Sequence, residues 1–246
     1  MEWEGPAVVL SARVHGEGDA LAAVMTEAQG THRGLARGGS SRARASLWQP
    51  GNLVQARWVA RLADQLGTLT AELVHPGAAL AMDDPLALAI LRSACAVAEG
   101  ALPEREPHPR VFAGLVHLIA NLAQWEDALT ELVRWEATVL AELGYGLDLS
   151  ACAVTGEISG LAWVSPRTGR AVSDAAAGRW RSRLLRLPGF LVGANAAGPE
   201  DWRDGLRLTG YFLERDAFGH HDRPLPLARH MLYDRVAGGV PARGGG

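Results

Sequence analysis

Six arginines follow one another in a stretch of the sequence that contains no acidic residue. Between Ala28 and Ala63 there is neither aspartate nor glutamate. The basic residues of this stretch are Arg33, Arg37, Arg42, Arg44, Arg57 and Arg61, with His32 beside them. A guanidinium group pairs with two phosphate oxygens at once, so arginines gathered on one surface suit a nucleic-acid backbone. We therefore predict a phosphate-binding face, and a solvated basic surface without a ligand is the alternative.

Two tryptophans lie within the same basic stretch. Trp48 and Trp58 are each able to stack on a nucleic-acid base. Trp58 alternates with small apolar residues along its segment, so its place is on a buried face. We expect both rings in the hydrophobic core, with Trp48 the better candidate for stacking.

The sequence lacks several residues and spacings on which common enzyme mechanisms depend. It contains no lysine, which excludes a phosphate-loop lysine, a Schiff-base lysine and a kinase-type lysine. Serine, histidine and aspartate occur, but never in the G-x-S-x-G spacing of a nucleophile elbow. We expect a protein that is not an enzyme and that holds no cofactor and no metal.

The cysteines and the paired histidines have plain interpretations. Cys95 and Cys152 are far apart in the sequence, and we expect free thiols instead of a disulfide. The adjacent residues His220 and His221 point to different sides of the chain and have no cysteine nearby. We interpret them as a solvated pair and not as metal ligands.

Charge is distributed unevenly over the rest of the chain, whose formal net charge is -3. From Leu80 to Ser150 there are eleven acidic residues and four arginines, whereas after Ser150 there are nine acidic residues and thirteen arginines. This uneven distribution favours separate surfaces for separate partners. Four arginines of the C-terminal part, Arg179, Arg181, Arg183 and Arg186, fit either a second phosphate site or a solvated helix face.

The first 75 or so residues have the pattern of five short strands. We expect them at Ala7–His15, Ala20–Glu27, Gly30–Arg37, Asn52–Arg61 and Leu66–Val74. The fourth alternates, with Val54, Ala56, Trp58 and Ala60 on one face and Gln55, Arg57 and Arg61 on the other. Five short strands in this length predict a small oligonucleotide-binding (OB-fold) barrel.

Helical spacing replaces the strand pattern after Pro76. Asp84 and Pro85 are typical of a helix start, and this helix extends to Gly100. Further helices are predicted at Val111–Gln124, around Leu132–Leu143, at Pro199–Asp216 and at Pro226–Val236. The prediction is an α+β protein in which a helical bundle follows the barrel. Residues 150–188 differ, because they are rich in glycine and turns.

A series of short motifs along the chain resembles the bacterial RecO family. They are Gly16–Asp19, Met25–Glu27 with Gly30, Ala36–Gly39 with Ser46, Leu66–Thr70, Trp135–Leu140, Leu143–Leu149, Leu187–Leu191 and Leu225–Arg229. Each motif is weak alone, but together they cover nearly the whole chain in the family's order.

The resemblance implies a non-enzymatic mediator of DNA repair by recombination. Such a protein binds single- and double-stranded DNA and anneals complementary strands. It also engages the C-terminal tail of single-strand-binding protein and works with RecR, in the RecF pathway, to load RecA. An apolar groove in the helical part is expected for the acidic tail, with Arg110 or Arg134 as its cationic partner.

One segment departs from the family's pattern. Many members carry a four-cysteine zinc site after the third helix, with the spacing C-x-x-C repeated twice. The corresponding positions here are Cys152, Thr155, Ser173 and Ala176. Structural zinc needs four ligands, usually cysteine or histidine, so we expect a zinc-finger-like fold without metal.

The expected organisation is a DNA-binding OB-fold domain at 1–78 and a helical domain at 79–246. The acidic start Met1–Glu4 lacks the basic residues of a signal peptide, and no apolar run is long enough to span a membrane. We expect a cytoplasmic, nucleoid-associated protein. The alternatives are a barrel that serves RNA or ribosomes, a hydrolase, and a scaffold whose barrel contacts only protein.

Overall fold

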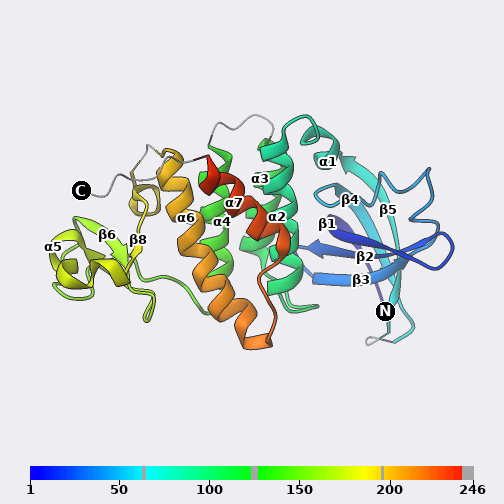
Figure 1. Cartoon of the computed structure of the whole chain (residues 1–246). Helices are drawn as coiled ribbons and strands as arrows, with labels where there is room; N and C mark the ends of the chain where they lie inside the picture. The colour runs from blue at the N-terminus through cyan, green and yellow to red at the C-terminus, as the bar shows by residue number, and fades with distance from the viewer. Residues whose placement is uncertain (63–64, 123–126, 195–196, 240–246) are drawn as a thin grey trace. The chain divides into compact units, whose positions relative to one another are not determined.

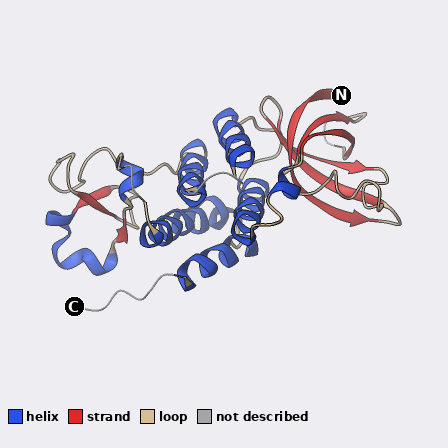
Figure 2. Cartoon of the chain, turned by 90° about the horizontal axis from the view of Figure 1, so that it is seen from above, coloured by secondary structure: helices blue, strands red, loops and turns tan. Residues whose placement is uncertain are grey.

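The computed structural model describes residues 1–62, 65–122, 127–194 and 197–239, except for the side chain of His221. The chain divides into two compact units, Met1–Glu126 and Asp127–Gly246. Its strands fall into two separate sheets, one in each unit (Figures 1 and 2).

The first unit begins with a five-stranded barrel. Its strands are β1 (Glu2–His15), β2 (Asp19–Thr26), β3 (Gly30–Ala36), β4 (Leu53–Val59) and β5 (Gly67–His75). The sheet order is β1-β2-β3-β5-β4, and β4 also pairs with β1, so the pairing forms a closed circuit. All of these pairs are antiparallel except β3 with β5. This five-stranded arrangement is the one expected of an OB-fold barrel.

The barrel closes at a short parallel seam that depends on glycine. Strands β3 and β5 are paired only at Gly34 with Gly67 and at Leu35 with Thr68. A Cβ atom on Gly67 would overlap the indole of Trp58, and one on Gly34 would lie 2.8 Å from Cγ of Leu69. The absence of side chains at both glycines therefore allows the two strands to approach.

Small residues and two tryptophans fill the barrel. The core includes Val9, Ala22, Val24, Val54, Ala56 and Leu69, together with Trp48 and Trp58. Along β4 the alternation is as predicted, because Val54, Ala56 and Trp58 are buried while Gln55 and Arg57 are exposed. An interior this narrow takes alanine and valine on most strands, and the two large rings occupy the remaining space.

Three helices complete the first unit. They are α1 (Gly77–Leu80), α2 (Pro85–Ala101) and α3 (Pro109–Asn121). Asp84 caps α2 by accepting a hydrogen bond of 2.8 Å from the backbone N–H of Leu86, and Pro85 occupies the first turn. The helix start predicted from these two residues is confirmed. Helix α2 packs against β1, and Figure 1 shows α2 and α3 beside the strands.

The second unit contains three long helices and an insert. The helices are α4 (Ala128–Glu142), α6 (Pro199–Phe212) and α7 (Leu227–Gly238), and a π-helical turn at Leu213–Phe218 continues α6. Helix α6 packs against both α4 and α7. Two buried side chains are ion-paired in this packing, Glu136 from α4 and Arg229 from α7.

The insert between α4 and α6 holds a small sheet of order β7-β6-β8. Its elements are β6 (Leu161–Val164), β7 (Ala171–Ser173), α5 (Asp174–Ala177), a 3-10 turn (Gly178–Arg183) and β8 (Leu185–Arg186). The α+β class, the five-stranded barrel and the following helices predicted from the sequence are confirmed. In the described residues, every helix is too short or too polar to cross a lipid bilayer.

Candidate nucleic-acid interface

The predicted arginines that are best placed to meet a ligand lie on the connection between β3 and β4. Consecutive turns fix this loop, with backbone N–H groups of Arg44 and Leu47 donating to carbonyl oxygens of Ser41 and Arg44, each at 3.0 Å. Gly38 has a positive φ of 66° and donates its N–H to Oδ1 of Asp19 at 2.7 Å. The loop is therefore attached to the start of β2.

Arg37 and Arg44 come together on this loop. The guanidinium of Arg44 donates to the backbone oxygen of Arg37 at 3.2 Å, and both residues line a pocket of about 290 Å³. Trp48 and residues 68–71 of β5 form other parts of the lining. Arg42 is exposed on the same loop.

Arg61 is exposed just after β4. We call Arg37, Arg42, Arg44 and Arg61 the open arginines. Within the described part of the chain, none of them forms an ion pair with a carboxylate. They are the strongest candidates among the predicted arginines for contact with phosphate oxygens.

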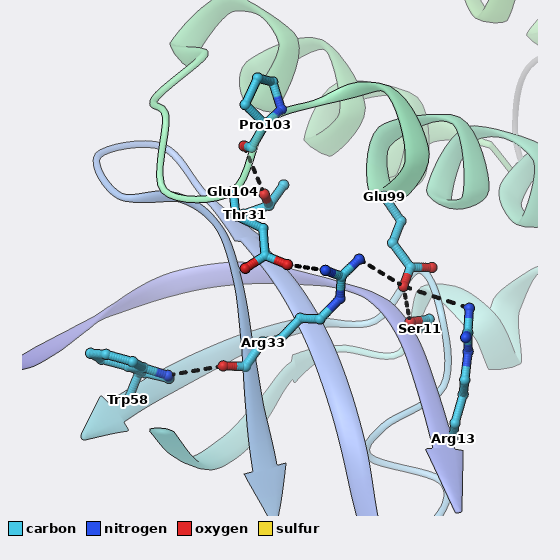
Figure 3. Close-up of polar contacts among 8 residues, drawn as sticks. All are labelled: Ser11, Arg13, Thr31, Arg33, Trp58, Glu99, Pro103 and Glu104. Carbon is cyan, nitrogen blue, oxygen red and sulfur yellow. Dashed lines mark hydrogen bonds and ion pairs between the residues drawn. The ribbon is translucent and has the colours of Figure 1, made fainter. Parts of the chain in front are cut away.

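Arg33 and Arg57 are held by carboxylates of their own unit. Arg57 lies 2.6 Å from Oε1 of Glu2 on the neighbouring strand β1. The guanidinium of Arg33 forms an ion pair with Glu104 and lies 3.8 Å from Glu99 (Figure 3). A phosphate would have to compete with these carboxylates, so these two arginines are weaker candidates for DNA contact.

The contacts around Arg33 join the barrel to α2 and to the chain that follows it. Oε1 of Glu99 accepts a hydrogen bond of 2.8 Å from Ser11 on β1, and Thr31 donates to the backbone oxygen of Pro103 at 3.0 Å (Figure 3). Gly30 has a positive φ of 69°, and a Cβ atom there would overlap the backbone of Glu106. These contacts assign Arg33 a structural part in docking the helix on the barrel.

Trp58 belongs to an aromatic cluster in the barrel. Its ring stacks on Trp3 at 6.5 Å, and His32 meets both rings edge-on at 5.2 Å. Its Nε1–H donates to the backbone oxygen of Arg33 at 3.1 Å. Burial, with the charge of Arg105 as a second cause, lowers the pKa of His32, which favours the neutral ring. Trp58 is thus a core residue.

Trp48 is also a core residue. Its exposed fraction is only 4 %, so the expectation that both tryptophans of the basic stretch belong to the core is confirmed.

Sequence comparison identifies the relatives of this chain. Residues 1–76 match the family model described as Recombination protein O N terminal, and residues 82–223 match Recombination protein O C terminal. The chain belongs to the RecO family.

Proteins named DNA repair protein RecO are similar over nearly their whole length. That of Granulibacter bethesdensis is 63 % identical over 240 residues, covering 96 % of each chain. That of Gluconacetobacter diazotrophicus is 60 % identical over 243 residues, covering 96 % of this chain and 95 % of the relative. The resemblance drawn from the motifs is confirmed, and with it the assignment to DNA repair and recombination.

The four positions that the family resemblance compares with zinc ligands, Cys152, Thr155, Ser173 and Ala176, belong to the insert. Sγ of Cys152 accepts hydrogen bonds from the backbone N–H of Ser173 at 3.3 Å and from its hydroxyl at 3.4 Å. Cys152 also belongs to a small apolar cluster with Trp163, Val172 and Ala177. One thiol with a threonine, a serine and an alanine does not provide four zinc ligands, so the donor set does not fit the metal.

No group of three or more potential ligands among His, Cys, Asp and Glu occurs within the described ranges. The contacts that the structure shows for Cys152 include the hydrogen bonds from Ser173 and the packing against apolar side chains.

The environment of Cys152 predicts a thiolate near neutral pH. Burial raises the pKa of this thiol, but the hydrogen bonds from Ser173 and Thr155 together have the larger effect. They lower the pKa to about 6. Burial and the charge of Glu99 raise the pKa of Cys95 to about 12, so that thiol stays protonated. We expect ultraviolet thiolate absorbance with a midpoint near pH 6, which Cys152→Ser abolishes and Cys95→Ala leaves unchanged.

The same shift has a consequence for stability. Because the pKa of Cys152 is lower in the folded state than its ordinary value of 9.0, its thiolate stabilises the fold fully above that value. The contribution is lost as the pH falls toward 6. Ser173→Ala should move the absorbance midpoint upward, and a midpoint near 9 in the unaltered protein would contradict the assignment.

The sequence placed six arginines in one candidate set, but it did not indicate which of them form ion pairs with carboxylates in the folded chain. The carboxylates that occupy Arg33 and Arg57 lie 71 and 55 positions away in the chain. The only local signal was the alternation of β4, which exposes Arg57 opposite β1.

Proposed function

We propose that this RecO-family protein binds single- and double-stranded DNA through the open arginines of its barrel and anneals complementary strands. The observation that carries the proposal is their position: three of the four lie on one ordered loop, without carboxylate partners in the described part of the chain. Arg33 and Arg57, which belong to the predicted set, would contribute less because carboxylates hold them. Contacts to phosphate oxygens do not read sequence, as an annealing protein requires.

Annealing follows from charge neutralisation. Two strands repel each other through their phosphates, and arginines that neutralise both backbones lower this repulsion. Bases on the two strands can then meet and pair. The process needs no covalent chemistry and no nucleotide hydrolysis.

The family context supports further partners. We propose that the protein acts with RecR, binds the C-terminal tail of single-strand-binding protein, and so helps to load RecA in the RecF pathway. We place the DNA-binding domain at 1–78 and the partner functions in the helical domain at 79–246, in the cytoplasm at the nucleoid. The two family matches, which end at 76 and begin at 82, support this boundary.

The structure shows where the two arginines suggested for the acidic tail lie. Arg134 already pairs with Glu131 at 2.5 Å and donates to the backbone oxygen of Phe190 at 3.2 Å. It would have to exchange these contacts to bind a carboxylate of the tail. Arg110 lies in the first turn of α3.

Salt dependence of single-strand binding tests the proposal. If each open arginine neutralises one phosphate, the slope of log affinity against log salt is about -3. Affinity for a labelled oligonucleotide should then fall by about 50-fold between roughly 50 and 200 mM salt. Fluorescence anisotropy measures this directly.

Two results would contradict the proposal. Affinity that does not change with salt would exclude phosphate neutralisation as the main contribution. Much tighter binding to an RNA oligonucleotide of the same sequence would redirect the barrel to RNA.

A further inference from the structure

A second arginine-rich surface lies on the insert, and the proposed barrel site does not use it. Its members are Arg179, Arg181, Arg183 and Arg186 with Trp163 and Trp180, and we call them the insert cluster. All four arginines are exposed. The cluster is formed by the 3-10 turn, by β8 and by β6.

Trp180 is an exposed aromatic ring with two cations close to it. Its exposed fraction is 49 %, and the guanidinium carbons of Arg179 and Arg183 lie 5.1 and 5.3 Å from the ring centre. An indole left in water forgoes the stabilisation that burial would provide. A half-exposed ring beside two guanidinium groups is suited to a flat ligand that carries negative charge.

Trp163 orders the other two arginines. The guanidinium carbon of Arg186 lies 4.1 Å from its ring centre and that of Arg181 lies 5.5 Å away. Asp174 accepts a hydrogen bond of 2.9 Å from Nε1 of Trp163 and forms an ion pair of 2.9 Å with Arg181. The side chains are therefore held before a ligand arrives, which reduces the entropy lost on binding.

A pocket of about 560 Å³ opens beside these residues. Arg179, Arg181 and Arg186 line it, and Arg207 from α6 adds a fourth cation. The carboxylate that lines the pocket, that of Asp204, lies 3.2 Å from Arg203. The charge facing the pocket is therefore strongly positive, and its volume lies in the range of ligand pockets, about 300–1,000 Å³.

We propose that the insert cluster is a second binding site for single-stranded DNA. Arg179, Arg183 and Arg186 contact phosphates, and a base stacks on Trp180. Arg181 contributes less, because Asp174 holds its guanidinium. The exposed ring favours a single strand over an acidic peptide, because every unpaired base offers a flat face whereas aspartate and glutamate do not. Duplex DNA keeps its bases stacked inside, so the cluster should prefer single strands.

The inference rests on the proposed function for the class of ligand, but not for the residues that bind it. In annealing, the insert cluster would hold a second strand while the barrel holds the first. The two sites are in different compact units, so variants of each can be examined separately.

The experiment measures binding of a labelled oligothymidine and annealing of two complementary strands by the full-length protein. Trp180→Leu should weaken binding in the barrel variant Arg37→Glu/Arg42→Glu/Arg44→Glu by about tenfold, because one stacked base is lost. Trp180→Phe should retain most of the affinity but lose the tryptophan quenching that the oligonucleotide causes. Arg179→Glu/Arg183→Glu should slow annealing in the otherwise unaltered protein.

Arg167→Glu is the matched control. This arginine is exposed in the same insert, on the turn between β6 and β7, and it does not line the pocket. Circular dichroism and thermal unfolding check that each variant is folded. The control should bind, quench and anneal like the unaltered protein.

The possible outcomes are distinct. The second site is supported if the cluster variants lose quenching and anneal more slowly while the control variant does not. If these variants bind, quench and anneal normally, or if an acidic peptide binds the cluster while the oligonucleotide does not, the inference is wrong. Neither result affects the barrel proposal, which the barrel variant tests by itself.

Discussion

Charge reversal of the three loop arginines together, Arg37→Glu, Arg42→Glu and Arg44→Glu, is expected to weaken single-strand binding by roughly 100-fold or more. Each change removes a donor from a phosphate and places a negative charge beside it. The loop itself should persist, because it is fixed by backbone hydrogen bonds and by Asp19. Fluorescence anisotropy with a labelled oligonucleotide at low salt measures the loss.

The matched control is the single change Arg92→Glu, compared with Arg42→Glu. Arg92 is exposed on α2 in the same compact unit, so the net charge of the protein changes equally. If both changes weaken binding to the same extent, the effect is one of net charge and not of a site. If the triple variant binds normally, the barrel contacts protein and the scaffold alternative is favoured.

The paired arginines should respond differently from the open ones. Arg57→Gln leaves Glu2 without its partner on the exposed face of two paired strands, where an ion pair contributes only about 0–1 kcal/mol. Arg33 lies among Glu99, Glu104 and the contacts to α2, so its replacement would first affect how the helix docks. A weakened interaction with DNA in an Arg33 variant would therefore need a test of folding before any interpretation.

Local patterns predicted most of the fold. The alternation along β4 and the Asp84–Pro85 helix start depend on neighbouring residues alone. Each of the five strands lies within a few residues of its expected position, and the first extends further toward the N-terminus, to Glu2. Its apolar character begins only at Ala7, and pairing with β4 extends the strand beyond that point.

The candidate sites were less accessible to sequence reasoning, because their chemistry depends on distant partners. The acid-free stretch indicated a basic face. However, Glu2, Glu99 and Glu104 lie outside this stretch and form ion pairs with two of its arginines in the folded chain. The four arginines of the insert left two interpretations open. Their stacking on Trp163 and Trp180 is a property of the folded insert, and it gives the phosphate-site interpretation its support.

The ion pair between Glu136 and Arg229 was also not predicted from the sequence. Its loss should lower the stability of the fold considerably. Exposed fractions of the two side chains are 0 % and 1 %. Arg229 donates to Oε1 of Glu136 at 2.5 Å, to Oε2 at 3.0 Å and to the backbone oxygen of Leu206 at 2.7 Å, and Thr209 also donates to this carboxylate. A buried pair with every oxygen occupied is stable only while both partners remain.

Arg229→Leu should lower the free energy of unfolding of the second unit by about 3–5 kcal/mol, because it leaves the carboxylate of Glu136 buried and unpaired. Glu136→Leu should cost a similar amount by isolating the guanidinium. The double variant removes both charges, so it should be more stable than either single variant. Chemical denaturation of all three proteins, followed by circular dichroism, provides the comparison.

Arg235→Leu serves as the control, since this arginine is exposed on the same helix α7 and should change stability by no more than about 0.5 kcal/mol. A double variant less stable than both single variants would mean that the buried charges are not the source of the cost. The ordering of the four proteins separates these cases. If the double variant recovers stability, α4, α6 and α7 pack around an ion pair that apolar side chains can replace, and its presence then indicates selection for something other than stability.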